Sequence, residues 1–269
     1  MSLLLLAATN GHAIEKLVIK GSDTLGAKLI PQLAEEFRAQ HPDIIFEIQA
    51  EGSTTGISAI IDGTADIATS SRKASIRERT AARAKGVTLN EIVVAYDGIA
   101  VVVNESNVLD NIRYRDLERI FTGDVVDWSA IAPMSGPISL YTRNTASGTY
   151  QDFKKLAMRR RDYAHKSQKM AGNEQIVQEV GKNINGIGYV GLSYLKSEGI
   201  KALPVDHVLP NAETIVNQSY SLTRPNYFYT NGSTSGITKS FIEFVLSEKG
   251  QTIIERVGFV TIPQDALNL

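Results

Sequence analysis

The chain has 269 residues, which is enough for one large domain or two lobes with separate cores, and we expect two lobes. Lysine and arginine number 28 against 29 aspartate and glutamate, so the formal charge of −1 disfavours a general binder of nucleic acid or acidic membranes. The 43% apolar and 21% charged residues are typical of a soluble globular protein, and no apolar run approaches the roughly 20 residues that span a bilayer.

The first residues resemble the end of a secretory signal. Residues 3–8 are apolar, and Gly11 and Ala13 stand at the small-x-small positions where such signals are cleaved. The basic start is missing and the apolar core is short, so residues 1–13 are predicted to be a residual, disordered signal or tag; a frayed cytosolic N-terminus is the alternative. The sequence has no cysteine, which excludes disulfides, thiolate metal sites and a lipid-anchor cysteine. We expect a free periplasmic protein.

Two strand–turn–helix units open the predicted fold. Residues 17–19 are expected to form a strand, and the apolar positions within residues 27–37 fall on one helical face. A second strand is predicted over residues 44–49, followed by a helix from residue 57 to about 63. A third short strand at residues 66–69 brings three strand ends toward one place, as at the ligand sites of open α/β sheets.

The remaining chain is predicted to build a second α/β lobe. A β-rich stretch at 92–104, interrupted at 96–98, and a β-like run at 227–230 are interpreted as paired strands that cross between the lobes. Between them we expect helices over 114–121 and 150–160 and strands over 138–142 and 186–190. Helices at 237–246 and 250–257 return the chain to the first lobe. The predicted division is therefore 14–99 with 227–269 for lobe 1 and 100–226 for lobe 2.

Three Ser/Thr/Gly-rich turns stand where a predicted strand gives way to a predicted helix, at residues 21–24, 52–56 and 147–149. A helix start presents unpaired N–H groups and partial positive charge, hydroxyls add donors, and glycine permits close approach, so such turns suit an anion. Any one of them is equally well an ordinary helix cap. Arg143 precedes the third turn and carries a guanidinium that matches phosphate oxygens. Together they predict a site for a small oxyanion.

In order and spacing, these segments resemble the phosphate-binding proteins of ABC importers. The resemblance extends from about Leu17 to Ile262 and is carried by residues 21–24, 52–56, 66–72, 96–104, 117–123 with Trp128, 143–149 and 222–225. It implies an α/β protein of the two-lobed type II periplasmic binding class, in which each lobe is a sheet flanked by helices and two crossing strands join the lobes. It also implies a monomer without cofactor or catalysis that captures phosphate and delivers it to an ABC transporter permease.

The resemblance assigns ligand-binding residues position by position. They are Thr24, Leu25 through its amide, Ser53, Ser71, Arg143, Ser147, Gly148 and Thr149. Ser22 in the first turn and Arg72 after the third predicted strand are added as ligand-binding candidates because of their positions. Some members carry an aspartate where this chain has Ser71, and that carboxylate accepts a hydrogen bond from protonated phosphate and so rejects sulfate. Asp23 is the candidate to replace it, although a role as N-terminal helix cap fits Asp23 equally well. Sulfate, molybdate and tungstate therefore stay open as alternatives to phosphate.

Other signals are weaker. The four histidines show no ligand spacing, so no metal is assigned. The basic residues 159–161 are interpreted as an exposed helix end balanced by Asp162 rather than a nucleic-acid patch, and Trp128 and residues 227–229 as packing rather than a stacking platform. Ser147 lies in no Gly-x-Ser-x-Gly motif and has no identifiable base, so no catalytic residue is assigned. A phosphatase or a phosphate-sensing protein on the same scaffold is the alternative.

Overall fold

The computed structural model describes residues 15–263 and has a mixed α/β fold. The strands are β1 (Lys16–Gly21), β2 (Ile45–Gln49), β3 (Ile67–Ser70), β4 (Leu89–Asn104), β5 (Ser139–Arg143), β6 (Gln168–Met170), β7 (Gly186–Gly191), β8 (Ile200–Leu203) and β9 (Thr223–Asn231). The α-helices are α1 (Asp23–Gly26), α2 (Leu29–Arg38), α3 (Ser53–Ile61), α4 (Ile76–Ala84), α5 (Tyr114–Thr122), α6 (Gly148–Leu156), α7 (Asn173–Lys182), α8 (Ala212–Val216), α9 (Gly236–Leu246) and α10 (Glu248–Val257). Residues 1–13, predicted to be a residual signal, lie outside the described part.

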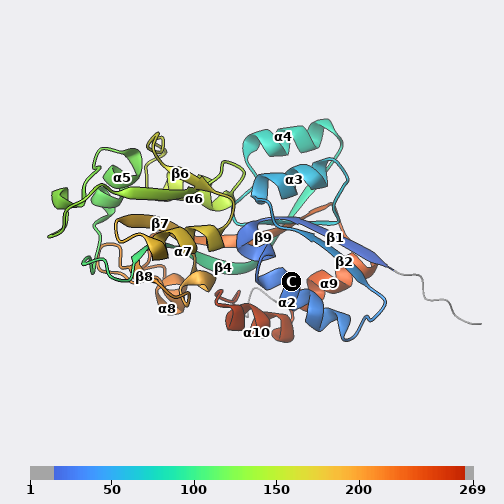
Figure 1. The fold of residues 1–269 in the computed structure, drawn as a ribbon. Coiled ribbons are helices and arrows are strands. Elements are labelled where there is room, and N and C mark those ends of the chain that lie inside the picture. The colour runs from blue at the N-terminus through green and yellow to red at the C-terminus, as the bar shows by residue number, and fades with distance from the viewer. Residues whose placement is uncertain (1–14, 264–269) are drawn as a thin grey trace, which may run out of the picture.

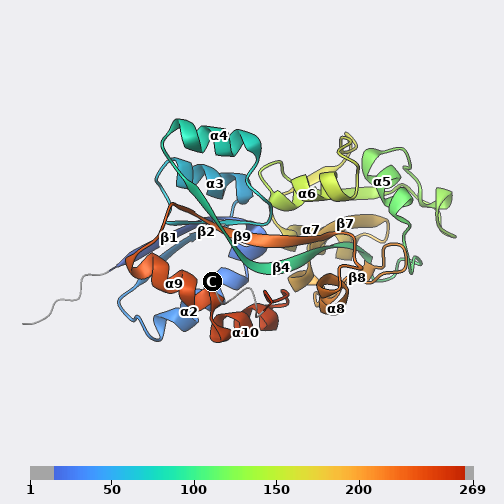
Figure 2. The same ribbon diagram turned by 180° about the vertical axis from the view of Figure 1, so that it is seen from behind.

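The strands form one continuous mixed sheet in the order β2-β1-β3-β9-β4-β7-β5-β6, with β8 paired to β4. Strand β1 is parallel to β2 and β3, and β5 is parallel to β6 and β7. Figures 1 and 2 show α2, α3, α4 and α9 gathered at one end of this sheet, α5, α6, α7 and α8 at the other, and β4 and β9 running side by side between them. The parallel strands at each end direct their carboxyl ends, and the turns that follow, toward one region.

The two predicted crossing strands do pair, because β4 and β9 are antiparallel from Leu89–Asn231 to Gly98–Thr223. From Ile99 onward, β4 pairs with β7 and β8 instead. The predicted interruption at residues 96–98 is wrong, since the strand continues through them and its only register shift lies between Val93 and Ala95. Aspartate and glycine are poor strand formers, but here the Asp97 carboxylate pairs with Arg224 directly across the sheet.

Two hydrophobic clusters hold the ends of the sheet. One is built by β1, α2, α9 and α10 around Leu33, Phe37 and Phe241. The predicted apolar face of residues 27–37 is confirmed from Ile30 to Phe37, whereas Ala27 is exposed because α2 begins only at Leu29. Fully buried apolar side chains of this size each contribute roughly 1.5–3 kcal/mol.

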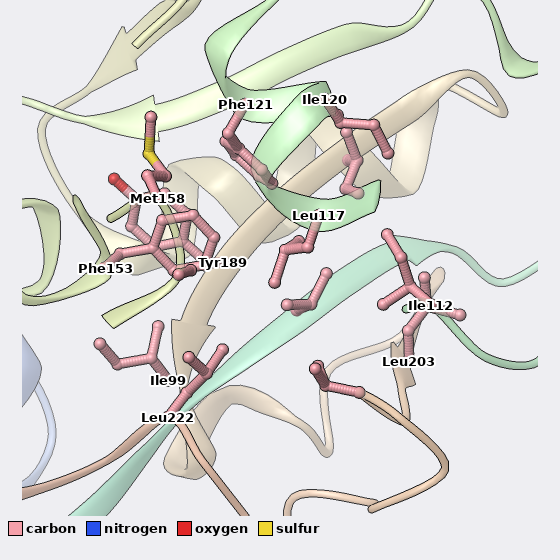
Figure 3. Packing of buried hydrophobic residues seen from close by; sticks show 14 of the residues in the cluster. Ile99, Ile112, Leu117, Ile120, Phe121, Phe153, Met158, Tyr189, Leu203 and Leu222 are labelled. Atoms are coloured by element: carbon pink, nitrogen blue, oxygen red, sulfur yellow. The ribbon is translucent and has the colours of Figure 1, made fainter. Parts of the chain in front are cut away.

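The other cluster is drawn from residues 99–222 and is shown in Figure 3. Phe121 of α5 packs against Phe153 of α6, and the Phe153 ring stacks on Tyr189 of β7 with centroids 4.1 Å apart. Trp128 is fully buried in the same cluster and donates its indole N–H to the Asn185 carbonyl. Tyr227, Phe228 and Tyr229 are buried as well, so the prediction that these aromatic residues pack rather than form a stacking platform is confirmed.

Candidate anion-binding site

The three Ser/Thr/Gly-rich turns meet at one place. Thr24 at the start of α1 and Thr149 at the start of α6 are 125 residues apart, yet their hydroxyl oxygens lie 3.1 Å from each other. Ser53 at the start of α3 lies 3.3 Å from the Ser71 hydroxyl and accepts a hydrogen bond from the Ser71 amide. All four side chains are buried. Helix starts and hydroxyl donors therefore converge in the manner that an anion requires.

Glycines allow this convergence. Gly52 has a φ of +131°, a backbone conformation that residues other than glycine rarely adopt. A methyl group there would lie 2.7 Å from the Ala146 carbonyl oxygen. At Gly148, a methyl group would lie 2.6 Å from the Ser71 hydroxyl oxygen and would also collide with that of Ser53. The backbone of the third turn therefore lies directly against the second, and no side chain separates them.

Arg143 ends β5 and is 1% exposed. Its Nη2 donates to the Ala171 carbonyl, and its Nη1 lies 3.1 Å from Asp23 Oδ2. Within residues 15–263, neither Nε nor Nη1 has a hydrogen-bond partner. Burial lowers the pKa of Arg143 and Asp23 opposes that shift, but a guanidinium keeps its charge in proteins. The side chain thus brings to the site a fixed positive charge, an Nε without a hydrogen-bond partner in the described part of the chain, and an Nη1 that forms an ion pair with Asp23.

The alternative prediction that Asp23 is an N-terminal helix cap is wrong. Asp23 is the first residue of α1, and the cap position belongs to Ser22. The Asp23 Oδ2 accepts hydrogen bonds from the backbone N–H and the Nδ2 of Asn173, at 3.0 and 2.6 Å. Asp23 Oδ2 therefore has three polar contacts: two hydrogen bonds from Asn173 and the ion pair with Arg143.

Asn173 is a site residue that the sequence reasoning missed. It is fully buried, begins α7, and accepts the Gly191 amide through its Oδ1. No helix at α7 was predicted from the sequence. The signal was present, because the apolar residues Ile176, Val177 and Val180 recur at helical spacing.

Arg72 is buried, but its guanidinium turns to Glu78. Two nitrogens bind the two Glu78 carboxylate oxygens at 2.8 and 2.7 Å, and Nη2 also donates to the Thr54 hydroxyl. Burial raises the pKa of Glu78, but the hydrogen bonds from Arg72 and Ser75 outweigh this effect, and the net pKa is lowered. In this structure Arg72 therefore braces the turn at Thr54, and its direct contact with a ligand stays a prediction.

The other predicted residues lie at the same helix starts. Ser22 and Leu25 are buried, and the Ser22 amide donates to the Thr69 carbonyl at the end of β3. Ser147 is the cap of α6, where its hydroxyl accepts the Tyr150 amide. That hydroxyl is thus engaged in capping the helix.

A buried ion pair lies beside the site. Arg224 Nη2 is 3.0 Å from Asp97 Oδ2, and the two side chains are 2% and 0% exposed. Asp97 also accepts the Leu192 amide through Oδ1. Burial raises the pKa of Asp97, and the positive charge of Arg224 opposes that shift. The pair joins β4 to β9 at the point where both strands pass between the two ends of the sheet.

The basic residues 159–161 form an exposed group, but the predicted balance by Asp162 is wrong. Arg161 pairs with Asp124 and Glu118, whereas Asp162 pairs with Lys154. No group of three potential metal ligands occurs among residues 15–263. No helix in this range is long and apolar enough to cross a membrane.

Comparisons with known proteins agree with this geometry. Residues 6–249 match the model of the PBP superfamily domain. The chain is 31% identical to the phosphate-binding protein PstS of Pseudomonas aeruginosa, over 90% of this chain and 82% of the relative. It belongs to the PstS family of phosphate-binding proteins. Another PstS relative, from Bacillus subtilis, is 30% identical over 91% of this chain and 80% of its own.

Solved structures extend the PstS family match to three dimensions. A protein from Clostridium perfringens, described as a phosphate ABC transporter substrate-binding protein with bound phosphate, superposes with a TM-score of 0.85 at 29% identity. The match covers 93% of this chain and all of that one. An ABC-type phosphate transport receptor from Vibrio cholerae gives a TM-score of 0.76, also at 29% identity, over 92% of this chain and all of its own.

Proposed function

We propose that this PstS family member captures phosphate between two lobes and delivers it to the permease of an ABC importer. The observation that carries the proposal is the convergence of three helix starts beside Arg143, a buried guanidinium that is ion-paired with Asp23 at the start of α1 and whose Nε has no hydrogen-bond partner among residues 15–263. The names of its relatives, phosphate-binding proteins and phosphate transport receptors, support the choice of phosphate and of transport.

The proposed lobes are residues 14–99 with 227–269, and residues 100–226. Their support is that the two large hydrophobic clusters fall almost entirely on either side of this division. Several contacts across the proposed gap are polar, Thr24 with Thr149 and Asp23 with Asn173, whereas Val260 packs against Leu192 and Ile215 in a small apolar cluster. Polar contacts of this kind are easily exchanged for water, so they suit surfaces that separate and close again.

The binding step follows from the donors. Arg143 supplies the charge, the hydroxyls of Thr24, Ser53, Ser71 and Thr149 supply neutral donors, and the first amides of α1, α3 and α6 supply dipoles. These groups are held in place by the fold before the anion arrives, so little ordering cost is left for binding. They surround an anion without offering a nucleophile or a general base, as expected for a binding protein rather than a phosphatase.

An extracytoplasmic location is part of the proposal. Its support is the apolar stretch at residues 3–8, which resembles the end of a secretory signal. Expression with a cleavable secretory leader, followed by release of the periplasm, tests whether the chain folds and binds phosphate there.

Isothermal calorimetry with phosphate, sulfate, molybdate and tungstate on ligand-stripped protein tests the function. We expect one phosphate per chain, bound more tightly than the other three anions. If another anion binds more tightly, that anion rather than phosphate is the ligand. If no anion binds, the proposal is refuted. Incubation with phosphomonoesters, compared with a Ser147→Ala variant, tests the phosphatase alternative, for which release of phosphate by the parent chain alone would be the sign.

A further inference from the structure

Asn226 is the polar side chain whose position the proposed function leaves unexplained. It lies within β9, is fully buried, and has no hydrogen-bond partner for either Oδ1 or Nδ2 among residues 15–263. Leaving both ends of a buried carboxamide unpaired is costly, and native proteins keep few such groups. A residue of this kind is expected where a ligand provides the missing partners.

The sheet places Asn226 at the base of the anion site. Ser70 of β3 is opposite Tyr227 of β9, so the next residues along the two strands, Ser71 and Asn226, are neighbours. Ala95 is opposite Asn226 and Asp97 opposite Arg224, so Asn226 and Asp97 share one face of the sheet.

That face is turned toward the site. A methyl group at Gly191 would lie 3.1 Å from Asp97 Oδ2 and equally 3.1 Å from Thr24 Cγ2. Asn226 therefore lies on the strand face that borders the site, between the Thr24 turn on one side and the Ser71 turn on the other. Arg224, on the same face, also keeps Nε and Nη1 unpartnered in the described part of the chain.

Most groups of the site can only donate hydrogen bonds, and Asn226 carries an unused neutral acceptor. Arg143 and the helix-start amides only donate, and the hydroxyls of Ser53 and Ser71 are engaged with each other. Asp23 is the other acceptor, but its Oδ2 already accepts two hydrogen bonds from Asn173 and contacts Arg143, and its negative charge repels an anion. Phosphate at neutral pH carries a proton that needs an acceptor, whereas sulfate carries none. A carboxamide offers both an acceptor oxygen and a donor NH₂ group.

We propose that Asn226 reads the proton of the ligand: its Oδ1 accepts the hydrogen bond from the phosphate hydroxyl and its Nδ2 donates to another phosphate oxygen. Asn226 thereby sets the preference for phosphate over sulfate. This inference rests on the proposed function and assigns the selectivity of the same site to a neutral residue on the crossing strand.

Asn226→Leu tests the proposal, because leucine keeps the branching of the side chain at Cγ and removes both polar atoms. Phosphate and arsenate, which both carry a proton, are expected to bind at least about tenfold more weakly, the loss typical of one ligand hydrogen bond with an unpaired partner left behind. Sulfate loses only the Nδ2 donor, so its affinity should fall by less than that of phosphate, and the phosphate-to-sulfate affinity ratio should drop. The melting temperature of the ligand-free variant is expected to stay level or rise, because two unpaired buried groups disappear.

Asn226→Asp and Ser193→Ala complete the experiment. The aspartate keeps an acceptor, so it should retain the preference for phosphate over sulfate while both anions bind more weakly. Ser193 has another hydroxyl that lacks a partner in the described structure, and Ser193→Ala should leave the phosphate-to-sulfate ratio unchanged. An unchanged ratio in Asn226→Leu, an equal loss for phosphate and sulfate, or a lost preference in Asn226→Asp would overturn the inference while leaving phosphate binding by the parent chain intact. A parent chain that binds no oxyanion would instead refute the proposed function.

Discussion

Replacing Arg143 by alanine is the most direct test of the proposed site. The guanidinium is 1% exposed, and its Nε and Nη1 have no hydrogen-bond partner among residues 15–263. Removing one partner of a buried charge pair costs about 3–5 kcal/mol, and each 1.4 kcal/mol is tenfold in affinity. Phosphate binding should therefore weaken by about two to three and a half orders of magnitude.

The ligand-free protein should lose far less stability than affinity. In the parent chain Arg143 itself carries a burial penalty that only Asp23 and the Ala171 carbonyl offset, and this penalty disappears with the side chain. We expect a change of less than about 2 kcal/mol in the free energy of unfolding by denaturant. Arg161→Ala is the matched control, because Arg161 is about half exposed and pairs with Asp124 at the surface.

Calorimetry on the parent and both variants decides the matter. Normal phosphate binding by Arg143→Ala would place the site elsewhere. An equal loss in Arg161→Ala would show that arginine content, rather than the position of the charge, governs binding.

Three further changes test the surroundings of the site. Gly148→Ala puts a methyl group 2.6 Å from the Ser71 hydroxyl oxygen, so phosphate affinity measured by calorimetry should fall at least about a hundredfold. The circular dichroism spectrum should stay unchanged. Phosphate binding within about twofold of the parent would contradict the close approach of the two turns. Asp97→Ala leaves Arg224 buried without its counter-charge and should lower the free energy of unfolding by about 3–5 kcal/mol. Asp62→Ala, which removes the exposed ion pair with Lys85, is the control and should lower it by no more than about 1 kcal/mol. The lowered pKa of Glu78 means that its ionised form stabilises the fold above the unfolded value of about 4.3 and that this stability is lost as pH falls through the folded pKa. Glu78→Gln should therefore flatten the decline in melting temperature below about pH 4.3, and an unchanged acid slope would refute the assignment.

The fold was predictable where the hydrophobic period was regular. The strands before the first two turns and the helix around Leu33 and Phe37 follow alternation and helical spacing, and the structure has them within a few residues. Helix α4 gave little such signal because Ala82 is its one buried residue, so its amphipathic pattern is weak. Its capping box, Ser75 with Glu78, was the available cue.

The site was predictable to the level of its turns and not to the level of its side-chain partners. Glycine, serine and threonine at strand ends indicate helix starts that an anion can use, and the turns at Thr24, Ser53 and Thr149 do converge. Which carboxylate meets which arginine depends on contacts between distant segments. Asp23 contacts Asn173, which is 150 residues away, and Arg143, which is 120 residues away. Local sequence patterns carry no information on such pairings.

The contacts of Asp23 bear on how a two-lobed protein would open and close. Its carboxylate contacts Arg143 and Asn173, which both belong to the other proposed lobe, so in the proposed two-lobed arrangement these contacts would favour closure. A ligand can shift an equilibrium only by its differential affinity for the two states, and a closed state that is already partly stabilised reduces the share of binding energy spent on closure. Asp23 would thus strengthen phosphate binding although its charge repels the anion. The two effects have opposite signs, and they separate kinetically: loss of closing contacts raises the dissociation rate, whereas loss of repulsion raises the association rate and makes it less dependent on salt.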